Sequence, residues 1–201
     1  MIVSCWRGNI GYQQDVQDSM EAMKLFDIDV SNYLKERSLK AGIILRSERD
    51  SAHWFMKEIG MTEEEYYQSI YKDRVDIIDT DFSTRNIYQV MMDSEVILAG
   101  FCSTALIEAF GIGKKILYCD YTKSNYFNDF DKAITLVQDD FLSLETPLFD
   151  QLDNLINVSN HQYQECYNDL MQRYQSFNKK HSTQKLIKTK IKEIITLNKA
   201  S

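Results

Sequence analysis

The fold is decided by residues 93–117, which read DSEVILAGFCSTALIEAFGIGKKIL. The apolar run Glu95–Ala99 stops at Gly100 and predicts a buried strand, because a strand that is covered on both faces shows no polar alternation. Ser103–Phe110 has the composition of a helix, and Lys115–Cys119 predicts the next apolar strand. A strand, a helix and a strand at this spacing are typical of a parallel βαβ unit.

The same alternation of short apolar runs and longer amphipathic runs extends along the chain. Further strands are expected at Met1–Cys5, Gly42–Arg46, Val75–Asp79 and Ala133–Val137. Further helices are expected at Gln13 to about Lys40, Ser51–Ile59, Glu63–Tyr71, Thr84–Met92, Pro147–Asn157 and His161 to about Asn198. These elements predict an α/β fold, a Rossmann-like doubly wound parallel sheet with a long C-terminal helix.

Two features refine the helical predictions. Thr62 followed by Glu65 is a capping box, which opens the helix at Glu63. In the first long helix a break is expected near Asp27–Ser31, with Asp29 or Ser31 as the cap of a second helix.

Charge is unevenly distributed along the 201 residues, whose formal net charge is −7. The segment from Met171 to Ser201 contains eight Lys or Arg residues and one acidic residue. It therefore carries a net charge of +7, and residues 1–170 carry −14. The acidic body argues against a nucleic-acid-binding face. We expect one domain over residues 1–160 and a basic amphipathic C-terminal helix over residues 161–201, packed on the domain or extending from it.

Cysteine usage and hydropathy point to a cytoplasmic protein. The four cysteines form no CxxC pair, so a zinc site or a disulfide framework is not expected. No stretch approaches the roughly 20 apolar residues that a membrane span needs. The three histidines show no metal-binding spacing, and no metal site is predicted.

The best candidate for a ligand site is the loop between Gly100 and Thr104. In an open parallel sheet, ligands bind beyond the carboxyl ends of the strands, where helices begin. A helix N-terminus favours phosphate, and Ser103 and Thr104 add hydroxyl donors there. Glu108 lies four residues after Thr104 on the same helix face, where a carboxylate can accept both hydroxyls of a ribose. An N-cap followed by a solvated glutamate explains these residues equally well.

Three arginines follow the first two predicted strands, Arg7 after one and Arg46 with Arg49 after the other. All three belong at the same edge of the sheet as Ser103, where they can clamp a diphosphate or a sugar carboxylate. The alternative is that these arginines form ion pairs on the surface, since Glu48 lies between Arg46 and Arg49 in the sequence.

Residues 93–117 resemble the nucleotide-sugar-binding segment of GT-B glycosyltransferases, and are most similar to the bacterial enzymes that build capsule and lipopolysaccharide chains. The likeness is good over about residues 73–120 and topological elsewhere. It implies that Ser103 and Thr104 contact the donor's phosphates and Glu108 its ribose. The loop that includes Asp120 would face the base or sugar. No cofactor or essential metal is implied beside the nucleotide-sugar substrate.

A GT-B enzyme has a donor-binding half and an acceptor-binding half, and this chain resembles the donor half. The resemblance therefore implies a partner domain or chain, and a surface-polysaccharide or glycolipid acceptor. Two other functions stay open, a nucleotide-sugar epimerase-like enzyme and a non-catalytic binding or scaffold module. For the basic C-terminal helix, packing against the sheet or toward the other domain is favoured over peripheral contact with an anionic inner membrane face.

Overall fold

The computed structural model describes residues 1–3, 15–45, 60–78, 87–100, 104–121, 135–137, 145–174 and 191. Its strands are β1 (Ile2–Val3), β2 (Ala41–Ile44), β3 (Val75–Ile78), β4 (Val96–Ala99), β5 (Lys115–Asp120) and β6 (Thr135–Val137). Its helices are α1 (Asp15–Glu36), α3 (Glu63–Tyr71), α4 (Ile87–Asp93), α5 (Thr104–Gly111), α6 (Glu145–Asn157) and α7 (Asn160–Tyr174), with a 3-10 turn, η1 (Lys72–Arg74).

The strands form one parallel sheet with the order β3-β2-β1-β4-β5-β6. Strand order reverses between β1 and β4, which are hydrogen-bonded neighbours in the sheet. Val3 at the end of β1 is in register with Ala99 at the end of β4. The ends of β1 and β4 therefore lie together at the point where strand order reverses, as in a doubly wound fold. The predicted α/β architecture is confirmed.

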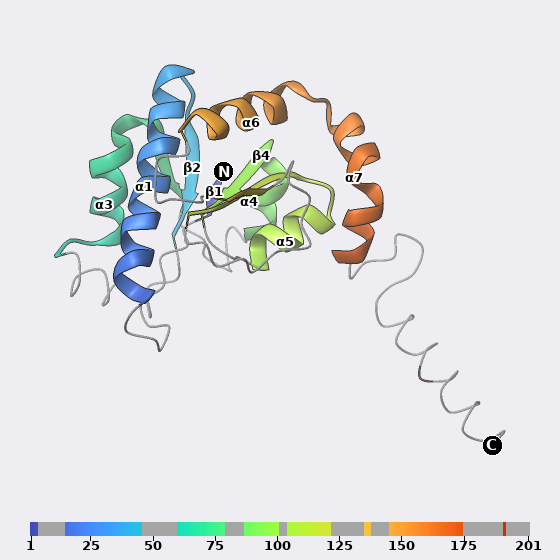
Figure 1. The fold of residues 1–201 in the computed structure, drawn as a ribbon, viewed down its shortest axis with the longest axis horizontal. Helices are drawn as coiled ribbons and strands as arrows, with labels where there is room; N and C mark the ends of the chain where they lie inside the picture. Colours follow the sequence, from blue (N-terminus) through green and yellow to red (C-terminus); the bar gives the residue numbers. More distant parts are fainter. Residues whose placement is uncertain are drawn as a thin grey trace.

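All six residues of β5 are buried, so both faces of this central strand are covered. In Figure 1, α1 and α3 lie side by side toward one end of the molecule, and α5 and α7 lie toward the other. Helix α6 contacts both α1 and β5, whereas α5 contacts β4, β5 and α7. The core is thus continuous from α3 to α7 across the central strands.

Helix α1 is unbroken from Asp15 to Glu36, so the predicted break near Asp27–Ser31 is wrong. Asp27 accepts hydrogen bonds from the hydroxyls of Tyr66 (3.0 Å) and Tyr71 (2.8 Å), and Asp29 accepts one from Tyr121 (2.7 Å). These carboxylates face buried tyrosines instead of capping a helix end. An apolar stripe continues past them, formed by Ala22, Met23, Phe26, Val30, Tyr33 and Leu34.

The capping box at Thr62 is confirmed together with the helix bounds Glu63–Tyr71. Thr62 Oγ1 accepts from the Glu65 amide at 3.1 Å, and Glu65 Oε2 accepts from the Thr62 amide at 2.7 Å. The Thr62 amide and the Thr62 hydroxyl (3.0 Å) both donate to the Glu65 carboxylate, and these two bonds lower the pKa of Glu65. The helix expected at Ser51–Ile59 lies outside the described residues, as does most of the segment expected to be helical after Tyr174.

A polar clamp joins α1 to α6. Arg37 Nε and Nη2 donate to the two carboxylate oxygens of Asp153 at 3.1 and 2.7 Å, and the Tyr33 hydroxyl donates to the same carboxylate at 2.8 Å. Hydrogen bonds from Arg37 and Tyr33 hold the pKa of Asp153 below its usual value of 3.8. Both ends of the ion pair are partly exposed, so solvent and salt screen it.

We expect Asp153→Asn to lower the midpoint of thermal unfolding slightly at pH 7, because the ion pair with Arg37 is lost. The lowered pKa of Asp153 stabilises the fold fully above pH 3.8, and this stabilisation is lost as pH falls through the lowered value. Asp150→Asn, an exposed carboxylate on the same helix, is the matched control. Equal midpoints for the two variants at pH 7 and low salt would contradict a stabilising clamp.

Candidate functional site

The carboxyl edge of β4 is the centre of the candidate site. The chain passes from Ala99 through Gly100 and enters α5 at Thr104. Beside it, β1 ends at Val3, which is paired with Ala99. The first turn of α5 therefore lies next to the point where strand order reverses, where doubly wound folds bind ligands.

Gly100 is buried at this edge, against α1. A Cβ on this residue would lie 2.7 Å from Cδ1 and Cγ of Phe26 and 3.1 Å from Cε of Met23. Real Cβ contacts are almost never as short as 2.7 Å, so the end of β4 can approach α1 this closely because the residue is glycine. This packing sets the distance between α1 and the start of the loop toward α5.

Glu108 is exposed, and it lies four residues after Thr104 in α5. Hydrogen bonding to the Glu108 carboxylate and its negative charge raise the pKa of Tyr88, on the first turn of α4. Sequence reasoning missed this influence, because the two residues belong to different helices and no local pattern predicts that they lie near each other.

Asp120 is the last residue of β5 and is 1% exposed, so the polarity of a loop tip does not explain it. The next residue, Tyr121, is also buried: its ring lies edge-on to Phe26 at 5.7 Å and its hydroxyl donates to Asp29. Burial, together with the charges of Asp29 and Asp120, raises the pKa of the Cys119 thiol. The end of β5 therefore carries buried polar groups near the core.

The other predicted site residues, Ser103, Arg7, Arg46 and Arg49, lie outside the described residues. The structure does describe β1 and β2, the two strands that precede these arginines in the sequence. β1 ends at Val3 and β2 ends at Ile44, and these two residues are paired in register. The ends of β1 and β2 therefore lie at one sheet edge, and the positions of the arginines stay a prediction.

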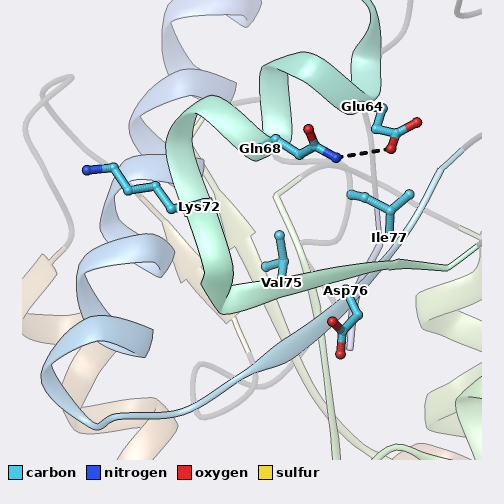
Figure 2. Close-up of a pocket in the computed structure, with 6 residues that line it drawn as sticks. All are labelled: Glu64, Gln68, Lys72, Val75, Asp76 and Ile77. Carbon is cyan, nitrogen blue, oxygen red and sulfur yellow. Dashed lines mark hydrogen bonds between the residues drawn. The ribbon is translucent and has the colours of Figure 1, made fainter.

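A second surface feature lies at the far edge of the sheet, where β3 is the terminal strand. Figure 2 shows a shallow depression between α3 and β3, lined by Glu64, Gln68, Lys72, Val75, Asp76 and Ile77. Gln68 donates to Glu64 across its rim at 3.0 Å. The depression lies at the sheet edge and away from the strand-order reversal, and it contains none of the predicted site residues.

None of the helices within the described residues is both long enough and apolar enough to cross a membrane. Within the same ranges, no three or more His, Cys, Asp and Glu side chains are grouped so that they could hold a metal ion.

Comparisons with known proteins bear on the fold. No protein-family model and no curated protein matches the sequence. Among solved structures, the chain is similar to the catalytic domain of cholesterol-alpha-glucosyltransferase from Helicobacter pylori, with a TM-score of 0.50 and 12% sequence identity. The alignment covers 86% of this chain and 97% of that chain. At this identity the likeness shows a shared fold.

Proposed function

We propose that this chain binds the nucleotide-sugar donor of a glycosyltransferase at the carboxyl edge of β4. One observation carries the proposal: exposed Glu108 lies four residues into α5, the helix that begins where strand order reverses. The shared fold with a glucosyltransferase catalytic domain supports it. So does the resemblance of residues 93–117 to the nucleotide-sugar-binding segment of GT-B enzymes.

In this proposal the diphosphate of the donor lies at the N-terminus of α5. The amides of the first turn, with the hydroxyls of Ser103 and Thr104, would donate to it. Glu108 would accept the ribose hydroxyls. Arg7, Arg46 and Arg49 would neutralise the phosphates from the ends of β1 and β2. Gly100 keeps the loop close to α1. Asp120 is buried at the end of β5, so the proposal gives it no direct contact with the nucleotide sugar.

The reaction would transfer a sugar from this donor to a hydroxyl of a surface polysaccharide or glycolipid. A bond forms between the anomeric carbon and the acceptor oxygen, whose proton passes to a base of the acceptor domain or partner chain. The bond from the anomeric carbon to the phosphate oxygen breaks, and the nucleotide leaves with that electron pair. An acceptor domain or partner chain would bring the acceptor. The protein would work in the cytoplasm, and the basic segment 171–201 would allow peripheral contact with an anionic membrane.

The experiment is thermal unfolding and calorimetry with CMP, CDP, UDP, GDP and dTDP. A nucleotide present at 100 times its Kd is expected to stabilise the wild type by about 2.7 kcal/mol. We expect Glu108→Ala to weaken binding at least about tenfold, because hydrogen bonds to a charged group contribute about 1.5–3 kcal/mol each. Glu165→Ala, an exposed glutamate on α7, is the matched control and should bind like the wild type.

Two results would contradict the proposal. One is the absence of any nucleotide-dependent shift in the wild type, which would favour a non-catalytic module. The other is equal affinity of Glu108→Ala and Glu165→Ala for the nucleotide that binds, since the ligand would then lie elsewhere.

A further inference from the structure

Building on the function proposed above, we infer that Tyr121 is a positioning residue, which holds Phe26 against Gly100 and so fixes the start of the loop toward α5. The phosphates of the nucleotide are proposed to bind at the end of that loop. Tyr121 is the first residue after β5, and its side chain is fully buried. It joins the end of β5 to α1, and α1 in turn contacts the end of β4.

The register of the sheet places Tyr121 just beyond the carboxyl end of β4. Tyr118 in β5 is paired with Ala99, the last residue of β4, so Tyr121 follows three residues after that level. The backbone turns sharply there, because the Tyr121 amide donates to the Cys119 carbonyl at 3.1 Å. The Tyr121 side chain therefore lies against α1 and away from solvent.

Two contacts hold Tyr121 on α1. Its hydroxyl donates to Asp29 Oδ2 at 2.7 Å, and its ring packs edge-on against Phe26 with 5.7 Å between the ring centroids. Asp29 and Phe26 are three residues apart in α1, so they lie on the same face of the helix. A Cβ on Gly100 would lie 2.7 Å from ring atoms of the same Phe26. Phe26 thus contacts both Tyr121 and the first residue of the loop.

Position in the sheet separates Tyr121 from the other tyrosines that bind α1. Tyr66 and Tyr71 also donate from buried hydroxyls to a carboxylate of α1, that of Asp27. Both belong to α3, which contacts β3, and the strands β2 and β1 lie between β3 and β4. The bonds to Asp27 therefore stabilise the fold away from the candidate site, whereas the bond to Asp29 acts beside it.

The hydroxyl bond of Tyr121 matters for binding because a loop that can shift presents its donors less well to a phosphate. Side chains in a close-packed core hold one another in place. Without its bond to Asp29, the Tyr121 ring constrains Phe26 less, and Gly100 gains freedom to move. The nucleotide must then order this end of the loop as it binds. This ordering is expected to weaken affinity about three- to tenfold.

The test is calorimetric measurement of Kd for whichever of CMP, CDP, UDP, GDP and dTDP binds the wild type best, at a temperature where every variant is folded. Tyr121→Phe removes the hydroxyl and keeps the ring. Tyr71→Phe is the matched control, because it removes a similarly buried hydroxyl from the other carboxylate of α1. Phe26→Leu, alone and with Tyr121→Phe, tests whether the effect passes through Phe26. Amide hydrogen exchange of the nucleotide-free protein is the second readout.

Both single tyrosine variants are expected to lower the midpoint of thermal unfolding, since each leaves a buried carboxylate with one donor fewer. Tyr121→Phe alone should raise Kd, by about three- to tenfold. It alone should also speed exchange at Gly100 and at residues 104–106 of the free protein. Neither effect should appear when Tyr121→Phe is added to Phe26→Leu.

Three results would overturn the positioning role while the proposed function survives. They are a Tyr121→Phe variant that binds like the wild type, an equal rise in Kd in Tyr71→Phe, and an effect of Tyr121→Phe that persists in the Phe26→Leu background. If the wild type binds none of these nucleotides, the proposed function is overturned and the positioning role with it.

Discussion

Gly100→Ala is expected to destabilise the protein by about 1–3 kcal/mol, the usual cost of an added group in a filled core. The new Cβ would lie 2.7 Å from two ring atoms of Phe26, which is 1% exposed and also packs edge-on against Tyr121. The ring therefore has little room to withdraw. Urea denaturation of Gly100→Ala and the wild type measures the loss.

Rescue by a smaller partner distinguishes this clash from a general intolerance at the position. In the Phe26→Leu background, Gly100→Ala should cost clearly less than in the wild type, because the flat ring that meets the new Cβ is gone. Equal costs in the two backgrounds would show that the contact with Phe26 is not what requires glycine.

Asp27→Ala is expected to destabilise the protein by about 2–6 kcal/mol, at about 1–3 kcal/mol for each buried hydroxyl that loses its acceptor. The Tyr66 and Tyr71 hydroxyls both donate to Asp27, which is 1% exposed. Burial and the charge of Asp27 raise the pKa of both tyrosines, so they remain donors at every ordinary pH. Thermal unfolding at pH 7 measures the effect.

Two variants bracket the Asp27 prediction. Asp27→Asn keeps one amide oxygen as an acceptor and should lose less stability than Asp27→Ala. Asp73→Ala removes an exposed carboxylate from η1 and should change stability little. A loss in Asp27→Ala no larger than in Asp73→Ala would contradict the buried network.

Helices and strands whose sequence signals lie within a few residues could be predicted from the local sequence pattern alone. The apolar run before Gly100 predicted β4, and Thr62 with Glu65 predicted the start of α3 to the residue. The alternation of strands and helices then predicted a doubly wound sheet, because parallel strands need crossover helices.

Contacts between residues that are far apart in the sequence could not be predicted from local sequence pattern. Asp27 and Asp29 are polar residues inside a helix, and locally they favour a break. Their role as hydrogen-bond acceptors depends on tyrosines that lie 39 to 92 residues away in the sequence and beside them in the structure. For the same reason Asp120 was expected in a loop, whereas it ends β5 and is buried.

The candidate site was predicted in part. Gly100, Thr104 and Glu108 lie along one segment, and the parallel topology places that segment at the edge where strand order reverses. Tyr88, whose pKa the Glu108 carboxylate raises, lies 20 residues earlier on α4, and the order of the strands in the sheet decides where these two helices lie. No spacing rule within one helix can supply such a pair.

Hydrogen exchange of the amides, with and without saturating nucleotide, tests most directly whether the ligand binds at the carboxyl edge of β4. We predict slower exchange at Gly100 and in residues 104–108, where the first turn of α5 would bind phosphate and Glu108 would bind ribose, with no change in α3 or β3. Protection confined to residues 64–77, around the depression between α3 and β3, would contradict that placement.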